Sequence, residues 1–252
     1  MSAPSHSALK NLIEEKRKTG ISLTTLGFGT GNYNDHLMEQ LADAGNGNYA
    51  YIDNLNEAQK VLVDEMSSTL NTIAKDVKIQ IEFNPATVAE YRLIGYENRI
   101  LKREDFSNDK VDAGEIGAGH TVTALYEIAL VGSGGERLEN LRYGEKKTAD
   151  GHNELVFLRL RYKAPDGDTS QLLEWALKRQ EIIETVETTS KRFRFSAAVA
   201  AFGQLLRGGK YLERFSYNEI LNLARGARGD DPFGYRAEFI KLVKLAQSLG
   251  SN

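Results

Sequence analysis

The strongest restriction on the fold of this chain is a change in hydrophobic period at Val77. Before Val77, segments whose apolar residues recur at helical spacing alternate with short, continuous apolar runs. From Val77 to Phe83 apolar and polar residues alternate, which is typical of a strand with one buried and one solvent-exposed face. From Thr189 onward the helical period returns. The chain is therefore expected to hold an α/β part, an antiparallel β part and a helical tail.

The first part alternates helices with short strands. The expected elements are a helix over Ala8–Lys18, a strand over Ile21–Leu26, a helix capped by Asn32 or Asn34, a strand over Tyr49–Ile52, and a long helix from the capping box at Asn54 to Ile73. This order is typical of a parallel sheet covered by helices. We expect residues 1–75 to form part of a doubly wound α/β domain.

The second part, residues 76–185, is expected to be an antiparallel β-sandwich. Its strands are expected at Val77–Phe83, Val88–Ile94, Thr121–Val131, Leu155–Tyr162 and Gln171–Leu177. Pro165-Asp-Gly167 joins the last two as a hairpin. The final strand has an alternative, because Ser170–Ile183 also fits a helix.

The third part, residues 186–252, is expected to be a small helical tail packed on the preceding parts. A largely buried helix ends before Gly208, and the capping box at Ser216 opens a second helix. Asp231 and Pro232 supply a cap and a first-turn proline for the last helix.

Composition excludes several classes of function. The 252 residues contain no cysteine, so disulfides, thiolate metal sites and cysteine nucleophiles are excluded. No apolar run approaches the roughly 20 residues of a membrane span, and Met1–Thr19 is too charged for a signal peptide. With a net charge of -3, we expect no nucleic-acid partner. The basic run Lys191–Arg194 is interpreted as the solvated first turn of a helix, with phosphate binding as the alternative.

The glycine loop after the first strand suggests one enzyme hypothesis. Gly27, Gly29 and Gly31 follow a strand, and Asp53 ends the next one, as in dinucleotide-binding folds. Asn32 stands where that fingerprint needs its third glycine. Backbone geometry is therefore the favoured explanation of the glycines, and a nucleotide-binding enzyme using the Gly27–Gly31 loop is the alternative.

The acidic loop from Asp105 to Glu115 suggests a metal site, and Asp105-x-Ser107-x-Asp109 begins like a calcium loop. Lys110 and Ile116 occupy the positions where that loop needs glycine and glutamate. The favoured interpretation is a solvated acidic loop. We expect no metal, no cofactor and no catalytic residue.

Several segments resemble bacterial von Willebrand factor type A domain proteins of the YfbK type. They are Ile21–Gly29, Gly31–Asp35, Gly45–Tyr49, Glu82–Pro85, Tyr91–Glu97, Asp112–His120 and Arg225–Gly234. The first three resemble the closing third of the type A domain, and the others resemble the C-terminal region of these proteins. The resemblance implies a chain that begins downstream of the Asp-x-Ser-x-Ser metal loop, so a divalent ion is expected only where that loop is present.

The resemblance implies a non-catalytic protein-binding or scaffold module in a bacterial envelope or assembly context. Asn32, Tyr33, Asn34 and Asp35, after the first strand, are the candidate partner-binding residues. A sheet with only two strands leaves an unpaired edge at Ile21–Leu26 or Tyr49–Ile52. We therefore expect either a homodimer through that edge or a missing amino-terminal segment that covers it.

Overall fold

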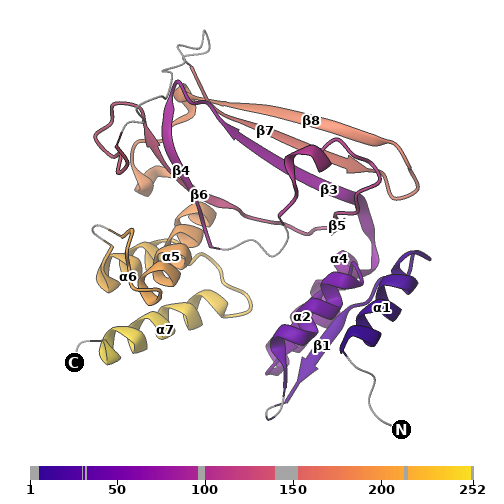
Figure 1. The fold of residues 1–252 in the computed structure, drawn as a ribbon. Helices are drawn as coiled ribbons and strands as arrows, with labels where there is room; N and C mark the ends of the chain where they lie inside the picture. Colours follow the sequence, from indigo (N-terminus) through magenta and orange to yellow (C-terminus); the bar gives the residue numbers. More distant parts are fainter. Residues whose placement is uncertain are drawn as a thin grey trace. The chain divides into compact units, whose positions relative to one another are not determined.

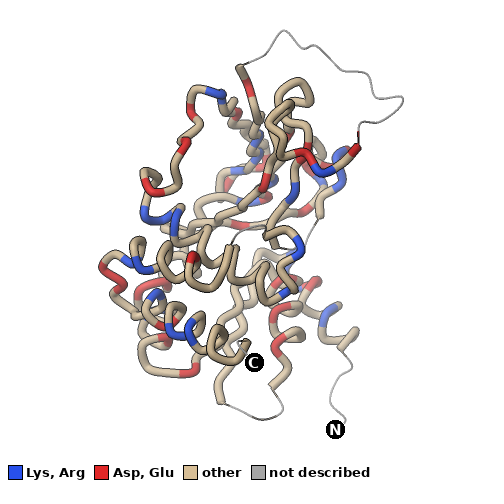
Figure 2. The backbone as a smooth tube through the Cα atoms, turned by 90° about the vertical axis from the view of Figure 1, so that its left-hand side faces the viewer, with Lys and Arg blue, Asp and Glu red and all other residues tan. Residues whose placement is uncertain are grey.

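The computed structural model describes residues 6–29, 31, 33–95, 100–139, 153–212 and 215–250. Its architecture is mixed α/β, with helices and three sheets (Figure 1). The chain divides into two compact units. The first comprises Met1–Ile79, Lys102–Thr121 and Leu160–Leu173, and the second comprises Gln80–Leu101, Val122–Arg159 and Glu174–Asn252. Basic and acidic residues are interspersed along much of the backbone (Figure 2).

The α/β part of the first unit contains a parallel strand pair, as expected. Strand β1 (Thr25–Phe28) pairs with β2 (Tyr49–Ile52) from Thr25↔Tyr49 to Phe28↔Ile52. Helices α1 (His6–Arg17) and α2 (Asp35–Ala44) share a small core of Ile13, Leu41 and Ala44. The first strand begins later than Ile21, because the Leu23 N–H donates to the Gly45 carbonyl before the parallel pairing starts.

The third helical segment is broken, so the prediction of one long helix to Ile73 is wrong. It consists of α3 (Leu55–Gln59), the π-helical turn η1 (Lys60–Asp64) and α4 (Met66–Leu70). Asn54 caps it as expected, accepting a 3.0 Å hydrogen bond from the Glu57 N–H. The expected buried stripe is exposed at Leu62, Met66 and Leu70, so burial does not hold these turns in one straight helix.

A four-stranded sheet has the order β5-β3-β7-β8. Its strands are β3 (Thr72–Phe83), β5 (Gly114–Gly117), β7 (Glu154–Lys163) and β8 (Ser170–Lys178). The segment after Ser170 is therefore a strand and not a helix. Strand β5 lies within the expected solvated loop and pairs with β3 across a register irregularity at Asp76, whose φ is 50°.

Strands β4 (Val88–Ile94) and β6 (Leu125–Leu130) form a separate antiparallel pair. Strand β6 starts later than the expected Thr121. The ring of Phe83 stacks on Tyr91 at 4.1 Å between centroids and lies 5.3 Å from Tyr126. Short 3-10 turns occur at η2 (Arg103–Asp105), η3 (Arg179–Glu181) and η4 (Val186–Thr188).

The helical tail consists of α5 (Lys191–Leu206), α6 (Tyr217–Gly226) and α7 (Tyr235–Leu249). Its core contains the fully buried Ala198, Ile220, Ala224 and Val243. The capping box at Ser216 is present as expected. Helix α7 begins at Tyr235, three residues later than a first-turn Pro232 requires, because Asp231 adopts a φ of 47° and Gly234 precedes the first helical residue.

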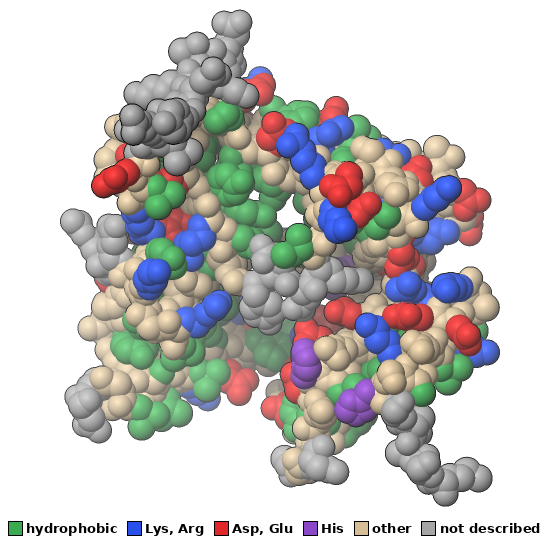
Figure 3. Space-filling view, in the orientation of Figure 1, with side chains coloured by type: hydrophobic (Ala, Val, Ile, Leu, Met, Phe, Trp, Pro, Cys, Tyr) green, Lys and Arg blue, Asp and Glu red, His purple; other side chains and the backbone are tan. Residues whose placement is uncertain are grey.

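The two faces of the four-stranded sheet differ in polarity. Arg159 donates to Glu174 Oε1 at 3.2 Å and to Gln80 Oε1 at 3.5 Å, so these side chains from neighbouring strands share one face. Because side chains alternate along a strand, the residues next to them lie on the opposite face. This opposite face carries Ile81, Phe83, Val156, Leu158, Trp175 and Leu177, and we call it the apolar sheet face. Figure 3 shows hydrophobic side chains gathered on the surface beside β6 and the end of β3.

The expected burial of β3 is inverted in its middle. Ile79 is 52% exposed, whereas Lys78 is only 3% exposed. The Lys78 ammonium donates to the carbonyls of Asp105 and Asn108, at 3.3 Å and 2.5 Å. The loop that carries these carbonyls buries Phe106 and covers the polar side of the strand, so backbone oxygens replace water around the buried ammonium.

Candidate functional site

The predicted site lies after β1, where Tyr33 folds back over the strand. Its hydroxyl donates to the Tyr49 hydroxyl at 2.7 Å, and the Tyr49 hydroxyl in turn donates to Asp35. A Cβ at Gly27 would lie 2.2 Å from the Tyr33 hydroxyl oxygen, so Gly27 makes room for the Tyr33 ring. Burial and the hydrogen bond to Asp35 raise the pKa of Tyr49 above its ordinary value. Two of the four predicted residues therefore belong to one hydrogen-bonded network.

The other two predicted residues differ from this pair. Asn34 caps α2, accepting a 3.0 Å hydrogen bond from the Leu37 N–H, and its side chain remains exposed. Asn32 lies outside the described residues. Tyr51 donates to the Gly29 carbonyl at 2.6 Å and so fixes the start of the glycine loop. The surface role of Asn34 and Asp35 stays a prediction.

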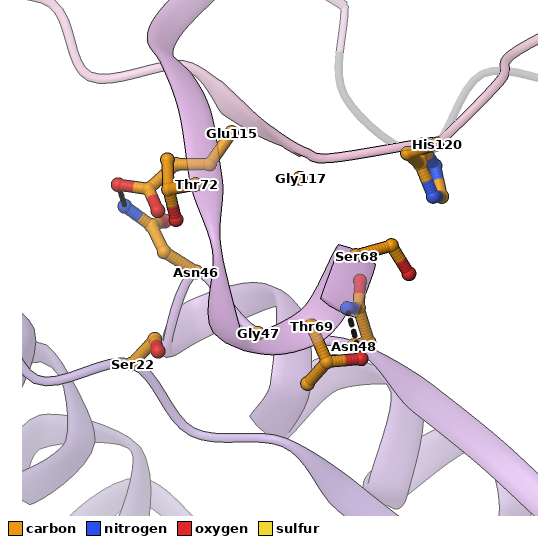
Figure 4. A pocket seen from close by; sticks show the side chains of 10 residues that line it. All are labelled: Ser22, Asn46, Gly47, Asn48, Ser68, Thr69, Thr72, Glu115, Gly117 and His120. Atoms are coloured by element: carbon orange, nitrogen blue, oxygen red, sulfur yellow. Dashed lines mark hydrogen bonds between the residues drawn. The ribbon is translucent and has the colours of Figure 1, made fainter. Parts of the chain in front are cut away.

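A second candidate is a small polar pocket in the first unit (Figure 4). Four segments line it, and their residues are Ser22, Asn46, Gly47, Asn48, Ser68, Thr69, Thr72, Glu115, Gly117 and His120. Two glycines allow the segments that line the pocket to approach each other closely. A Cβ at Gly47 would lie 1.8 Å from the Leu23 carbonyl oxygen, and a Cβ at Gly117 would lie 1.5 Å from the Ser68 carbonyl oxygen. The volume of about 30 Å³ accommodates a water molecule.

Asn46 and Glu115 give this pocket its chemical character. Asn46 Nδ2 donates to Glu115 Oε1 at 3.4 Å, whereas Asn46 Oδ1 is buried without a hydrogen-bond donor among the described residues. Partial burial raises the pKa of Glu115 above its ordinary value. A small donor such as water fits this buried acceptor, and the arrangement assigns no reaction to the pocket.

The acidic loop is solvent-exposed at Asp109 and Asp112, as expected, and both side chains also have partners within the protein. Asp109 Oδ1 accepts hydrogen bonds from Ser170 Oγ at 2.5 Å and from Arg161 Nη2 at 2.9 Å, and both hold its pKa below the ordinary range. Asp112 pairs with Arg17 at 3.0 Å. Asp109 and Asp112 thus have separate protein partners. Within the described ranges, no group of three or more His, Asp or Glu side chains is placed to share an ion.

A third candidate is the apolar sheet face at its β8 edge. Trp175 is 64% exposed and Leu177 is 38% exposed, on the last strand in the sheet order. Sequence reasoning did not single out these residues, because the helical alternative for Ser170–Ile183 left their orientation open. The alternation Leu173, Trp175, Leu177 was the available signal.

Comparisons with known proteins identify relatives of the chain. The sequence model of the family described as "Uncharacterized protein YfbK, C-terminal" matches residues 68–249. The chain is 49% identical over 245 residues to "Uncharacterized protein YfbK" of Escherichia coli strain K12, a match that covers 96% of this chain. The chain spans 42% of the length of that relative.

One solved structure also aligns with the chain. The crystal structure of the ArnB paralog VWA2 from Sulfolobus acidocaldarius has a TM-score of 0.37 and 15% identity, covering 88% of this chain and 55% of the other. The sequence matches, and not this alignment, carry the family assignment. In the described part of the chain, no helix combines the length and apolar character needed to cross a bilayer.

Proposed function

The chain belongs to the YfbK family, and we propose that it acts there as a non-catalytic module that binds other proteins. The observation that carries this proposal is the exposure of Trp175 at the edge of the apolar sheet face. A tryptophan that is 64% exposed beside Leu177 is a costly arrangement for a surface with no partner. Aromatic anchors of this kind dominate the binding energy of protein interfaces.

The region around Trp175 has further exposed apolar side chains. In the second unit Leu177, Ile182 and Ile183 follow Trp175 along the chain, with exposures of 38%, 43% and 57%. Burial of such side chains contributes roughly 25 cal/mol for each Å² removed from water. A protein partner would therefore gain more from this surface than a small polar ligand would.

The proposal includes a finer description of the architecture. We propose that residues 1–75 are the end of a type A domain, supported by the parallel pair β1–β2 and the helices beside it. We further propose that residues 76–185 form a sandwich, supported by the stacking of Phe83 on Tyr91. We propose residues 186–252 as the third part, a helical tail, supported by the core that α5, α6 and α7 share.

The nucleotide-binding alternative makes a different prediction. In dinucleotide folds a loop glycine lets the pyrophosphate approach the backbone. The space beside Gly27 is filled by the Tyr33 ring, which favours a structural role for this glycine. A thermal-shift screen with nucleotides is expected to leave the melting temperature unchanged, whereas a saturable rise would support the alternative.

The binding proposal is tested by comparing the parent chain with Trp175→Glu and with Leu249→Glu, a control at a 69% exposed residue in the last turn of α7. Proteins captured by the parent chain from an Escherichia coli lysate would be identified, purified and titrated calorimetrically against all three chains. We expect a partner whose affinity falls for Trp175→Glu and is kept for Leu249→Glu. If every captured protein binds the three chains equally, the apolar sheet face is not the binding surface.

A further inference from the structure

Strand β8 combines an open backbone edge with exposed side chains on both of its faces. It stands at the end of the order β5-β3-β7-β8, and among the described residues no further strand pairs with it. Leu172, Leu173 and Trp175 are 42%, 57% and 64% exposed. The strand contains no proline, a residue that protects many edge strands from pairing. Its backbone groups can therefore accept another strand.

The sequence of β8 is complementary to itself in one antiparallel register. When two copies pair about a two-fold axis through Trp175, directly opposite residues lie on the same face. On the apolar face Trp175 then meets its own copy, and Leu173 meets Leu177 of the second copy. On the other face Glu174 lies diagonal to Lys178 of the second copy, at the distance of about 7–8 Å that long side chains bridge.

Neighbouring registers are less favourable. Moving the axis to Glu174 lengthens the ladder but sets two glutamates directly opposite each other, which is destabilising. Moving it to Ala176 sets Glu174 directly opposite Lys178, but it places Leu173 opposite Arg179 and shortens the paired segment. Moving it to a point between two residues brings Trp175 onto the polar face of the second copy. The axis at Trp175 is therefore the one that matches all three apolar residues Leu173, Trp175 and Leu177 with one another and sets no like charges directly opposite.

We infer that β8 pairs with β8 of a second copy of this chain, antiparallel and centred on Trp175, to form one sheet that runs through both molecules. The inference rests on the proposed function, because it names a second copy as the partner of the same surface. The identical patch serves both molecules, as a two-fold interface requires. This edge differs from the β1–β2 edge that the sequence suggested.

The first test measures self-association of the full chain by sedimentation equilibrium from low to high micromolar concentration. Trp175 is the one tryptophan of the chain, so its emission is expected to shift to shorter wavelength as the dimer forms. Trp175→Lys sets two ammonium groups against each other and is expected to raise the dissociation constant by about thirtyfold or more, the effect of losing a central anchor. Leu249→Glu is expected to dimerise like the parent.

The second test reads the register directly, because the chain has no native cysteine. The proposed register places residue 174 directly opposite residue 176 of the second copy and leaves Trp175 in place. In a mixture of Glu174→Cys and Ala176→Cys chains, the mixed 174–176 disulfide is therefore expected to form faster under mild oxidation than the 174–174 or the 176–176 disulfide. Circular dichroism checks that each variant is folded. Fastest formation of a disulfide between like residues, or equal rates for all three disulfides, overturns the register.

The outcomes separate this inference from the proposed function. A parent chain that remains monomeric at high micromolar concentration overturns the β8 pairing. If a different protein then binds the monomer and loses affinity for Trp175→Glu, the binding function stands without the homodimer. A dimer that persists in Trp175→Lys with unchanged affinity places self-association on another surface and also overturns the inference.

Discussion

At the scale of single residues, the position of the Tyr33 ring requires a glycine at residue 27. A methyl group at this position would lie 2.2 Å from the Tyr33 hydroxyl oxygen and 2.4 Å from Cζ. We expect Gly27→Ala to lower the free energy of unfolding by about 1–3 kcal/mol, because the ring must leave its place over β1. Denaturant unfolding of the parent and the variant measures this difference.

A double-mutant cycle and a second glycine provide the controls for Gly27. Gly27→Ala should cost much less in a Tyr33→Ala background, where the ring is absent. Gly203 lies inside α5 with open space at its Cβ position, so Gly203→Ala should stabilise by about 0.5–1 kcal/mol. If Gly27→Ala lowers the unfolding free energy equally with and without Tyr33, the loss comes from the backbone conformation at residue 27 and not from contact with the Tyr33 ring.

Glu115 gives a pH dependence with a definite sign. Burial raises its pKa in the folded state, so the folded chain holds the proton more tightly than the unfolded chain. The Glu115 carboxyl therefore adds to folding stability below its ordinary pKa, and this added stability is lost as pH rises through the raised pKa. We expect Glu115→Gln to gain stability relative to the parent as pH rises from 4 toward neutrality, as measured by melting temperature across buffers.

A neighbouring carboxylate serves as the control for Glu115. The pKa of Asp109 is lowered by Ser170 and Arg161, so its stabilisation is present at neutral pH and is lost as pH falls through the lowered pKa. Asp109→Asn should therefore lose stability relative to the parent at neutral pH and approach it in acid. The same trend for both variants would contradict the opposite environments of the two groups.

Some of these residue roles were predictable from the sequence and others were not, for a physical reason. Capping by Asn34 and Asn54 was predictable, because a cap acts on the backbone of the next three residues. The contact between Tyr33 and Tyr49 joins residues from separate elements, and no local pattern specifies it. The burial of Lys78 under a distant loop reverses the alternation rule on which its prediction depended.

At the scale of elements, the start of α7 depends on Asp231 through its carboxylate. Its two oxygens accept hydrogen bonds from the Arg236 and Ala237 N–H groups at 3.0 Å and 2.9 Å. We expect Asp231→Ala to destabilise by about 1.5–3 kcal/mol, the range for hydrogen bonds to a charged group. Asp231→Asn should cost less, because asparagine keeps an acceptor and tolerates the positive φ.

The adjacent Asp230 is the matched control for Asp231, since it is exposed and has the same charge. Asp230→Ala should change the unfolding free energy by less than about 0.5 kcal/mol. Thermal unfolding followed by circular dichroism at 222 nm compares the three variants. Equal losses for Asp230→Ala and Asp231→Ala would indicate a general charge effect and not a cap.

Short elements bounded by strong local signals were the most predictable. Strands β2 and β4 coincide with their expected ranges, and α6 follows its capping box. The helix expected to reach Ile73 depended on burial that the fold does not supply, so it breaks at η1. Strand β5 has glycine at both ends and forms only because β3 offers it a partner.

At the scale of the whole molecule, the described residues form two separate buried clusters. One joins α5, α6 and α7 around Ile220 and Val243, and the other joins α1 and α2 around Ile13 and Leu41. The sequence predicted both through helical periodicity. It did not predict that Trp175 and Leu177 stay exposed at the β8 edge of the apolar sheet face, because the covering of a face depends on elements far apart in the chain.

The separation of the two clusters predicts that each can be weakened alone. Ile220 is fully buried, and Ile220→Ala should cost about 2–5 kcal/mol through lost contacts and a residual cavity. Hydrogen exchange measured by mass spectrometry should then lose protection in α5, α6 and α7 while α1 and α2 keep theirs. Leu41→Ala should produce the reverse pattern. If either substitution lowers protection equally in both helical groups, the chain unfolds as one cooperative body, and the two clusters are parts of a single folding unit.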